Sequence, residues 1–474
     1  MEAASNRTFD EIAIGDTATV TRTLAQNDLV VFAHASGNLN PLHLDGRQGE
    51  GDDETAVAPS MWVAALFSAV LGNRLPGPGT LYRSQAVRFL GRAHVGDTLS
   101  VRVTVREKRA GNVVLFDGVV TNQRGAIIAE GECEVLAPTK RVALGDANLP
   151  DLVFHRHAKF DRLIAACAGL PALPTAVAHP CDGASLEGVA EAAKAGLIIP
   201  LLVGPTAKIR AAAEAAGVDI TGFEIVDAPH SHAAAARAVA LVHEDRAAAV
   251  MKGALHSDEL LHEIIKRDGG LRTKRRLSHV FVLDAPGLSH LLLVTDAAIN
   301  ILPDLMTKAD IVQNAIDLAR AIGIARPKVA IMSAVETVNP AIPSSIDAAV
   351  LSKMAERGQI TGGIVDGPLA MDNAIDIDAA RTKGIASLVA GHAEVLVVPN
   401  LEAGNMLAKN LTFVAHADAA GLVLGAAVPV MLTSRADDAR ARLASAALAV
   451  LHHHWQVTGT SAVPPQEQPT DLGA

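Results

Sequence analysis

After residue 151, short apolar runs alternate with Ala-rich stretches of helical length, and this alternation restricts the fold more than any other feature. Each run ends in a small or polar residue, and the runs are TAVAHP, GLIIPLLVG, AAAVMKG, HVFVLD, LLLVTD, KVAIMSA, GGIVDGP and EVLVVPN. Continuous apolar runs of this length are typical of strands that are buried on both faces. The pattern therefore predicts βα repetition, in which a helix follows each strand and the sheet is largely parallel.

The ends of these predicted strands are the first places to look for function, because ligands of such sheets bind beyond the carboxyl ends of the strands. The polar residues that end the runs are Asp296, Ser333, Glu336, Asp366 and Asn400. Lys252 ends another run and could attract phosphate, although a solvated lysine is the simpler interpretation.

Residues 81–136 follow a different pattern. Apolar and polar residues alternate at 99–105 and at 114–120, and the turn sequences RAGN and QRGA separate the runs. This pattern predicts an antiparallel meander. Ahead of it, SMWVAALFSAVLG (60–72) is apolar on nearly every side, which is typical of a helix enclosed by a curved sheet.

Composition excludes several classes of function. The 474 residues are enough for two to four domains. The net charge of −10 is spread along the chain and aromatic residues make up 3%, which argues against a nucleic-acid surface. Cys133, Cys167 and Cys181 are far apart and lack metal-ligand spacing, as expected for reduced thiols in a cytoplasm. The run His452–His454 is interpreted as a chance surface cluster, so no metal site is predicted.

The ends of the chain carry no targeting signal that the sequence reveals. MEAASNRTFDEIAIGD is acidic and has no apolar core, so it does not resemble a signal peptide. The longest apolar runs are too short to span a bilayer, and we expect a cytoplasmic protein without membrane contact. The tail from residue 457 is polar and Pro-rich and is predicted to be disordered.

Five stretches of the second region carry a family resemblance: LLVTDAAINILPDLMTKADIVQNAIDLARAIGI, AIMSAVETVNPAIPSS, QITGGIVDGPLAMDNAI, VVPNLEAGNMLAKNLTF and PVMLTSRADDARARLASAAL. In this order they resemble the phosphate acetyltransferase and phosphate butyryltransferase family, from about residue 158 to 450. The resemblance implies two α/β subdomains with a cleft between them. It also implies acyl transfer between coenzyme A and inorganic phosphate, with a CoA thioester and phosphate as substrates and no tightly bound cofactor.

Within TSRAD, the resemblance assigns the family's catalytic Ser-Arg pair to Ser434 and Arg435. Arg435 would hold phosphate or the acyl phosphate through its planar fork, and Ser434 would donate to the developing oxyanion. Asp437 is the candidate base for the thiol, with Asp438 adjacent to it. Ser434 to Asp437 also fits the S-x-x-D pattern that caps a helix, and one serine can cap and catalyse at once.

Further candidate substrate-binding residues lie elsewhere in these motifs. Gly404 and Asn405 are expected at a strand-to-helix turn, where glycine lets the backbone approach an anion; an ordinary αL turn is the alternative. Asp296, Asn300 and Asp366 could line the cleft, or could serve only as strand-end and turn residues. Neither GxxxxGK[ST] nor GxGxxG is present, so no ATP or dinucleotide site is expected.

Residues 8–138 resemble the MaoC-like hydratases of the hot-dog fold, through RTLAQNDLVVFAHASGNLNPLHLD and GPGTLYRSQAVRFLGRAHVGDTL. In active members of that family a loop reads G-D-x-N-P-x-H, and its Asp and His activate water for addition to a 2-enoyl-CoA. In this chain Asn38 replaces the Asp, whereas Asn40, Pro41 and His43 are retained. An amide does not accept a proton near neutral pH, so Asn38 cannot act as a general base.

The start of the central helix departs from the hydratase pattern as well. The family has His-Gly-Met there, and the Gly amide helps to bind the thioester oxygen, whereas residues 59–61 read Pro-Ser-Met. We therefore predict a degenerate hydratase site of Asn38, Asn40, His43 and Ser60, with impaired or absent hydration. An active site that uses His43 and an Asn-held water is the alternative. The domain could also persist because it binds acyl-CoA or drives homo-oligomerisation.

The predicted fold is an α+β hot-dog domain followed by an α/β domain of two subdomains with largely parallel sheets and a cleft between them. The predicted organisation is a MaoC-like domain at 1–140, a linker at 141–157, an acyltransferase domain at 158–456 and a disordered tail at 457–474. Subdomain I would comprise about 158–276 and 421–456, and subdomain II about 277–420. The main hypothesis is a phosphate acyltransferase acting on small molecules. The alternatives are a bifunctional enzyme with active (R)-specific hydration and a non-catalytic acyl-CoA-binding scaffold.

Overall fold

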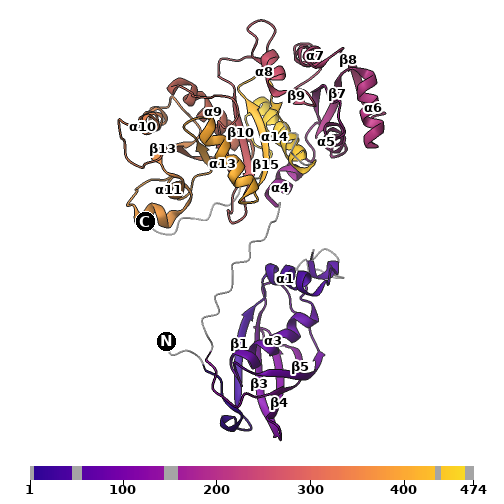
Figure 1. The fold of residues 1–474 in the computed structure, drawn as a ribbon, viewed down its shortest axis with the longest axis vertical. Coiled ribbons are helices and arrows are strands. Elements are labelled where there is room, and N and C mark those ends of the chain that lie inside the picture. Colours follow the sequence, from indigo (N-terminus) through magenta and orange to yellow (C-terminus); the bar gives the residue numbers. More distant parts are fainter. Residues whose placement is uncertain (1–4, 45–55, 144–157, 433–438, 465–474) are drawn as a thin grey trace. The chain divides into compact units, whose positions relative to one another are not determined.

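The computed structural model describes residues 5–44, 56–143, 158–432 and 439–464. The chain divides into two compact units, Met1–Phe154 and His155–Ala474 (Figure 1). Because each unit has its own hydrophobic core, the two are described separately.

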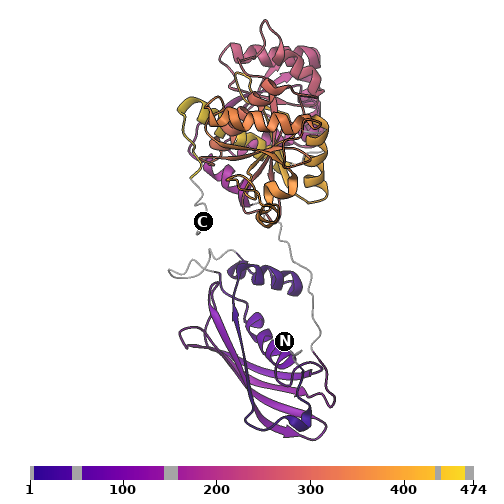
Figure 2. The ribbon, with the colours of Figure 1, turned by 90° about the vertical axis from the view of Figure 1, so that its left-hand side faces the viewer.

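The first unit is an antiparallel sheet curved around one helix (Figure 2). Among the described residues this sheet has five strands in the order β1-β3-β4-β5-β2. The strands are β1 (Thr17–Thr23), β2 (Leu81–Phe89), β3 (Thr98–Arg109), β4 (Val113–Thr121) and β5 (Ile127–Leu136). The helices are η1 (Phe9–Glu11), α1 (Gln26–Ser36), α2 (Pro41–Leu44) and α3 (Ser60–Asn73). The predicted meander and the enclosed helix are both confirmed, and the unit has the hot-dog fold.

The core of this unit forms where α3 lies against the sheet. Phe67, Val70 and Leu71 are fully buried and pack in one cluster with the inward-facing residues of β3. Gly118 of β4 leaves room for the helix, because a Cβ atom at this position would lie 2.5 Å from Cε1 of Phe67. The position of α3 over β4 therefore depends on this glycine.

The second unit is built on one mixed sheet. Among the described residues the sheet has 11 strands in the order β13-β12-β14-β11-β10-β15-β16-β9-β6-β7-β8. The strands are β6 (Leu173–Ala178), β7 (Ile198–Gly204), β8 (Glu224–Asp227), β9 (Ala249–Lys252), β10 (Ser278–Asp284), β11 (Leu292–Thr295), β12 (Lys328–Met332), β13 (Ile364–Leu369), β14 (Val395–Val397), β15 (Asp418–Leu424) and β16 (Val430–Met431).

The sheet consists of two parallel halves that run in opposite directions. β6, β7, β8, β9 and β16 are parallel to one another, as are β11, β12, β13 and β14. β10 and β15 join the halves and pair antiparallel with each other and with their outer neighbours. The expectation of largely parallel sheets is confirmed within each half. The carboxyl ends of the two halves point toward opposite edges of the sheet.

One detail of the predicted βα repetition is wrong. The run HVFVLD forms β10, which no helix follows; it leads directly to β11, with Val280 paired to Thr295. A strand buried on both faces has the same apolar composition in either direction, because composition records burial and not the direction of the neighbouring strand.

Helices cover both faces of this sheet. They are α4 (Ala158–Ala166), α5 (Gly183–Lys194), α6 (Thr206–Ala216), α7 (Ser231–His243), α8 (Ser257–Ile265), α9 (Leu305–Ala321), α10 (Pro343–Glu356), α11 (Met371–Ile375), α12 (Ile377–Thr382), α13 (Leu401–Phe413) and α14 (Ala439–Thr458). On one face, a single core cluster spans both halves and includes residues of α5, α9 and α14. On the other face the halves have separate clusters, one with α7 and α8 and one with α11 and α13.

The chain end and the histidine run differ from the sequence predictions. α14 continues to Thr458, and residues 459–464 pack against α9, so this part of the predicted disordered tail is ordered. Val463 is 4% exposed, and the Ser461 hydroxyl donates to the Ala321 carbonyl at 2.8 Å. His452 is 6% exposed, so the interpretation of a surface histidine cluster is also wrong.

Three general properties follow for the part of the chain that the structure describes. None of its helices is both long enough and apolar enough to cross a bilayer. No three His, Cys, Asp or Glu side chains in it lie close enough together to hold a metal ion. All three cysteines are free thiols, and burial raises the pKa of each, to about 12 for Cys167.

Candidate active site

Ser434, Arg435 and Asp437 lie outside the described residues, but the elements on either side of them are defined. β16 ends at Met431 and α14 begins at Ala439. β16 pairs with β9 (Met431 with Met251), and β9 pairs with β6 (Lys252 with Ala178). The carboxyl end of the strand that leads into TSRAD therefore lies beside the carboxyl ends of β9 and β6.

Lys252 ends β9 at this place and is only 6% exposed. The interpretation as a solvated lysine is therefore wrong. The next residue, Gly253, lets the backbone pass close to β6: its N–H donates to the Ala178 carbonyl at 2.9 Å, and a Cβ would lie 2.6 Å from the same oxygen. A buried lysine therefore lies at the end of β9, beside the carboxyl end of β16.

His179 follows β6 at the same group of strand ends, and the sequence analysis did not single it out. Its backbone has a φ of 54°, and its Nδ1 is buried without a hydrogen-bond partner among the described residues. Burial, followed by the positive charge of Lys208, lowers the pKa of His179, whereas Glu259 opposes this shift. The imidazole is therefore neutral near pH 7. A lone histidine after a strand gave no signal that distinguished it from an ordinary loop residue.

Asp296 lies at the end of β11, in the other half of the sheet, and is 2% exposed. Its Oδ1 accepts from the backbone N–H groups of His279, Ala298 and Ile299 at 3.3, 3.0 and 3.1 Å. Its Oδ2 accepts from the backbone N–H and side-chain amide of Asn300 at 2.9 and 2.5 Å. With five donors on two oxygens, this carboxylate holds the loop that follows β11.

Asn300 and the start of α13 complete this loop. The Asn300 amide also donates to the Leu277 carbonyl at 2.8 Å. The Asn405 amide donates to the Ala297 carbonyl at 3.3 Å, while Asn400 caps α13 by accepting from Ala403 N–H at 2.9 Å. The side chains of Asp296, Asn300 and Asn405 thus belong to one connected group.

The expected turn at Gly404 is not present. Gly404 lies within α13, is buried, and has no positive φ. A Cβ there would lie 2.7 Å from Cγ2 of Val398 and 3.0 Å from Cα of Ala297. Glycine is required because the helix packs closely on the loop after β11, so neither the open turn nor the αL alternative is correct.

The strand-end residues of β12 and β13 lie farther along the same half. Asp366 is half-buried in the middle of β13 and not at its end; its Oδ1 accepts from the Gly367 N–H at 2.8 Å. Ser333 is 8% exposed, and its hydroxyl lies 3.0 Å from that of Ser344. Glu336 pairs with Lys383 at 3.6 Å. These three residues do not contact the Asp296 group through any of these interactions.

The register of the central strands relates the two groups of strand ends. Val430 of β16 pairs with Val423 of β15, and the adjacent Leu422 pairs with Val280 of β10. Val280 in turn pairs with Thr295 at the end of β11. The ends of β16 and β11 are therefore almost level and three strand spacings, roughly 14 Å, apart. β16 and β11 each lie next to one of the two central strands, but they run in opposite directions, so the chain leaves the sheet toward opposite edges after each of them.

In the first unit, the loop after α1 is organised by its own asparagines. α1 ends at Gly37, which has a φ of 72°. The Asn38 side-chain oxygen accepts from Asn40 N–H at 3.2 Å, and the Asn40 oxygen accepts from Leu42 N–H at 3.1 Å. The amide at Asn38 therefore supports the turn in the way that a carboxylate would.

His43 has a defined orientation. Its Nδ1 lies 2.8 Å from the carbonyl oxygen of Val57. Since a carbonyl only accepts, Nδ1 carries the proton and Nε2 is the basic nitrogen of the neutral ring. Ser60 is the first residue of α3, where backbone N–H groups have no acceptor within the helix.

Comparison with known proteins agrees with both parts of this description. The family described as phosphate acetyl/butaryl transferase matches residues 232–450, and the family described as MaoC like domain matches residues 12–124. A phosphate acetyltransferase of Rhizobium meliloti is 65% identical over 294 residues, covering 62% of this chain and 93% of that protein. A phosphate butyryltransferase of Clostridium acetobutylicum is 44% identical over 276 residues, covering 58% of this chain and 92% of that protein.

Solved structures match the second unit. A branched-chain phosphotransacylase from Enterococcus faecalis V583 is 31% identical, with a TM-score of 0.53 over 60% of this chain and 99% of that one. A phosphotransacetylase from Streptococcus pyogenes shares the fold, with a TM-score of 0.55 at 20% identity over 64% of this chain and 99% of that one. The fold and these matches define an acyltransferase fused to a MaoC-like hot-dog domain. The chain belongs to the phosphate acetyltransferase and butyryltransferase family, as the sequence motifs indicated.

Proposed function

We propose that this chain transfers an acetyl or another short acyl group between coenzyme A and inorganic phosphate. The observation that carries the proposal is the 65% identity to the Rhizobium meliloti phosphate acetyltransferase over 93% of that protein. A CoA thioester and phosphate are the substrates, and the chemistry requires no tightly bound cofactor. A phosphate oxygen attacks the thioester carbonyl, the C–S bond breaks, and the CoA thiolate leaves.

The proposed catalytic residues are Ser434, Arg435 and Asp437. Arg435 binds the phosphate through two parallel N–H donors, and Ser434 donates to the oxyanion that forms at the carbonyl. In the reverse direction Asp437 takes the proton of the CoA thiol. Lys252 supports this assignment because it adds a buried positive charge at the end of β9, beside the strand that leads to these residues.

The contacts of the other predicted substrate-binding residues separate those that position a loop from one that could contact the substrate. Asp296 is fully used by five N–H donors, so we propose that it positions the loop that carries Asn300. Gly404 and Asn405 support that loop from α13. Asp366 keeps Oδ2 outside its one described hydrogen bond, and it remains our candidate for a direct contact with the substrate.

The test is phosphate-dependent release of the CoA thiol, followed with a thiol reagent, for acetyl-CoA and butyryl-CoA at matched concentrations. Because the identity is higher to an acetyltransferase than to a butyryltransferase, we expect the larger kcat/KM with acetyl-CoA. A pocket with room for two further methylenes would instead favour butyryl-CoA, by about 1.6 kcal/mol or roughly tenfold. Absence of phosphate-dependent release with either thioester would favour the non-catalytic scaffold.

For the hot-dog domain we propose that hydration of 2-enoyl-CoA is impaired, because Asn38 cannot accept a proton. The orientation of His43 favours a second candidate function, a bifunctional enzyme, since Nε2 is kept as a base by the bond between Nδ1 and Val57. Retention of His43 in this orientation also suits a domain that binds acyl-CoA without turnover.

We further propose that the chain acts as a homo-oligomer. The edge strand β2 supports this, because nearly all of its residues are exposed, including Leu81 and Phe89 at 64% and 38%. Exposed apolar residues on an edge strand favour pairing with another strand. Light scattering coupled to size-exclusion chromatography tests the oligomeric state; a monomer across micromolar concentrations would contradict it.

A further inference from the structure

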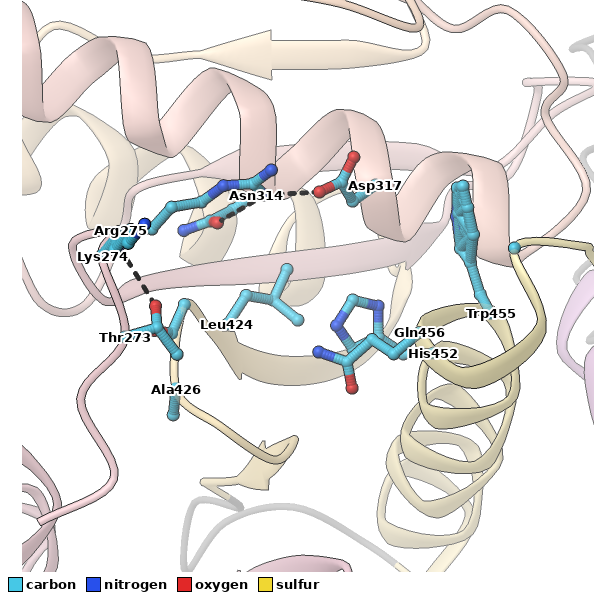
Figure 3. Close-up of a pocket in the computed structure, with 12 residues that line it drawn as sticks. Thr273, Lys274, Arg275, Asn314, Asp317, Leu424, Ala426, His452, Trp455 and Gln456 are labelled. Atoms are coloured by element: carbon cyan, nitrogen blue, oxygen red, sulfur yellow. Dashed lines mark hydrogen bonds and ion pairs between the residues drawn. The ribbon is translucent and has the colours of Figure 1, made fainter.

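A pocket of about 590 Å³ lies in the second unit, between the C-terminal halves of α9 and α14 (Figure 3). This volume is typical of sites that bind small molecules. His452 and Trp455, which line it, lie roughly 20 to 25 Å along α14 from the first residue of that helix, which follows TSRAD. The pocket therefore lies near the end of α14 that is remote from TSRAD along the chain.

The pocket has one cationic end. Lys274 and Arg275 line this end and are exposed to solvent. Arg275 uses Nη1 to pair with Asp317 at 2.5 Å. Lys274 makes no ion pair with any described residue, so the Lys274 charge is not compensated. One net positive charge at this end favours a monoanion.

The opposite end is apolar. Figure 3 shows Trp455 across the pocket from Lys274 and Arg275, with the Leu424 side chain between them. Arg320, which does not line the pocket, lies over the Trp455 ring at 4.8 Å from its centroid and holds the indole in place. Since one face of the ring is covered by this cation, the remaining surface of the indole is a fixed wall against which an apolar group can pack.

The helix between these ends keeps buried polar atoms without partners. Nδ1 of His452 and Nε1 of Trp455 are buried and have no hydrogen-bond partner among the described residues. Figure 3 shows the His452 imidazole directed into the space between the two helices. Burial lowers its pKa to about 4, so the ring is neutral and does not add to the charge of the cationic end. Because both atoms are buried, they are not available to a ligand, and the contacts with a bound molecule come from the other atoms that line the pocket.

We propose that this pocket binds a small carboxylate with an apolar body, at a site distinct from the acyl-transfer residues. The carboxylate pairs with Lys274 and with the edge of Arg275 that does not contact Asp317. The apolar body packs on Leu424 and Trp455. Inorganic phosphate does not fit this description, because it has no apolar part to place against the indole.

The two tryptophans of the chain give a direct measurement. Trp62 lies in the first unit, so a full-length Trp62→Phe protein reports on the pocket through Trp455 alone. The probe is 3-phenylpropionate, with the uncharged 3-phenylpropionamide as its control. We expect saturable change of Trp455 emission with the acid and about tenfold weaker binding of the amide, because the amide lacks the charge.

A matched pair of lysine variants in the Trp62→Phe background tests the cationic end. Lys274→Met should weaken binding of 3-phenylpropionate about tenfold. Lys353→Met, which removes an exposed lysine of α10 that pairs with Glu356, should leave it within about twofold of the parent. No saturable change, equal binding of acid and amide, or equal effects of the two substitutions would overturn the proposal. So would Trp455 emission that depends on protein concentration but not on the acid, because a second copy of the chain would then cover the pocket.

Discussion

At the scale of single residues, we predict that acyl transfer depends first on Arg435. Arg435→Ala should lower kcat/KM by about 10²-fold or more and raise KM for phosphate, because the substrate loses its bidentate partner. The kcat/KM of Arg435→Lys should fall between those of the wild type and Arg435→Ala, because lysine keeps the positive charge but lacks the planar pair of N–H donors. Arg440→Ala is the control, because Arg440 pairs with Asp161 on α4. Wild-type turnover and phosphate affinity in Arg435→Ala would remove this residue from the site.

We predict that Asn38 decides whether the hot-dog domain hydrates 2-enoyl-CoA. With crotonyl-CoA the wild-type chain should show hydration near background, and Asn38→Asp should restore it, because the turn already uses the side-chain oxygen at this position. The gain should disappear in Asn38→Asp/His43→Ala, which removes the base at Nε2. The measurement is loss of the enoyl thioester absorbance.

Two other outcomes of the crotonyl-CoA assay would change this interpretation of the hot-dog domain. If Asn38→Asp stays inactive until residues 58–61 are also restored to the hydratase sequence, the carbonyl donors near Ser60 are the second defect. Robust hydration by the wild-type chain would show that His43 with an Asn-held water is sufficient.

The buried His452 gives the second unit a pH-dependent stability. Burial lowers the pKa of His452 to about 4, with Asp317 opposing this shift. The unfolded chain therefore takes up a proton near pH 6.5 that the folded chain refuses, so stability falls as pH drops from about 6.5 to 4. In the Trp62→Phe background, where Trp455 is the only tryptophan, His452→Gln should lose about 1 kcal/mol less free energy of unfolding than its parent between pH 7.5 and 5.5, as measured by denaturant unfolding. Equal losses in the two proteins would contradict a neutral buried His452.

At the scale of elements, the loop after β11 tests whether a strand-end carboxylate is structural. Asp296→Ala should leave several buried N–H groups without an acceptor, at about 1–3 kcal/mol each, and lower the unfolding midpoint sharply. Asp366→Ala, which loses one described hydrogen bond, should lower it far less. If Asp296→Ala keeps the wild-type midpoint and only KM rises, Asp296 contacts substrate instead.

The same elements show what the sequence could and could not predict. Apolar runs located β6, β7 and β11 to β14, because burial on both faces leaves a record in composition. The direction of β10 and the packing of Gly404 on Ala297 depend on contacts between distant segments, which no local pattern contains. For the site, motif order indicated the family and TSRAD, whereas His179 and the burial of Lys252 became visible only through strand pairing.

At the scale of the whole molecule, a chain that begins near Leu149 should keep acyl-transfer activity. The composition change across residues 137–151 and the division into two units motivate this prediction. The test compares thiol release by the truncated and full-length chains at equal concentration, after circular dichroism has verified folding. A well-folded but inactive truncated chain would mean that the hot-dog domain contributes to the transfer site.

The paired strands β10 and β15 also have an evolutionary consequence. Residues 285–417 lie between β10 and β15 and form one continuous segment. The two ends of this segment are neighbours, because Asp284 pairs with Asp418. Its two ends are separated by a single strand spacing, about 5 Å. Recombination between relatives can therefore exchange this segment as a unit without changing the path of the rest of the chain. Such exchange would let residues 285–417 diversify separately from the rest of the second unit.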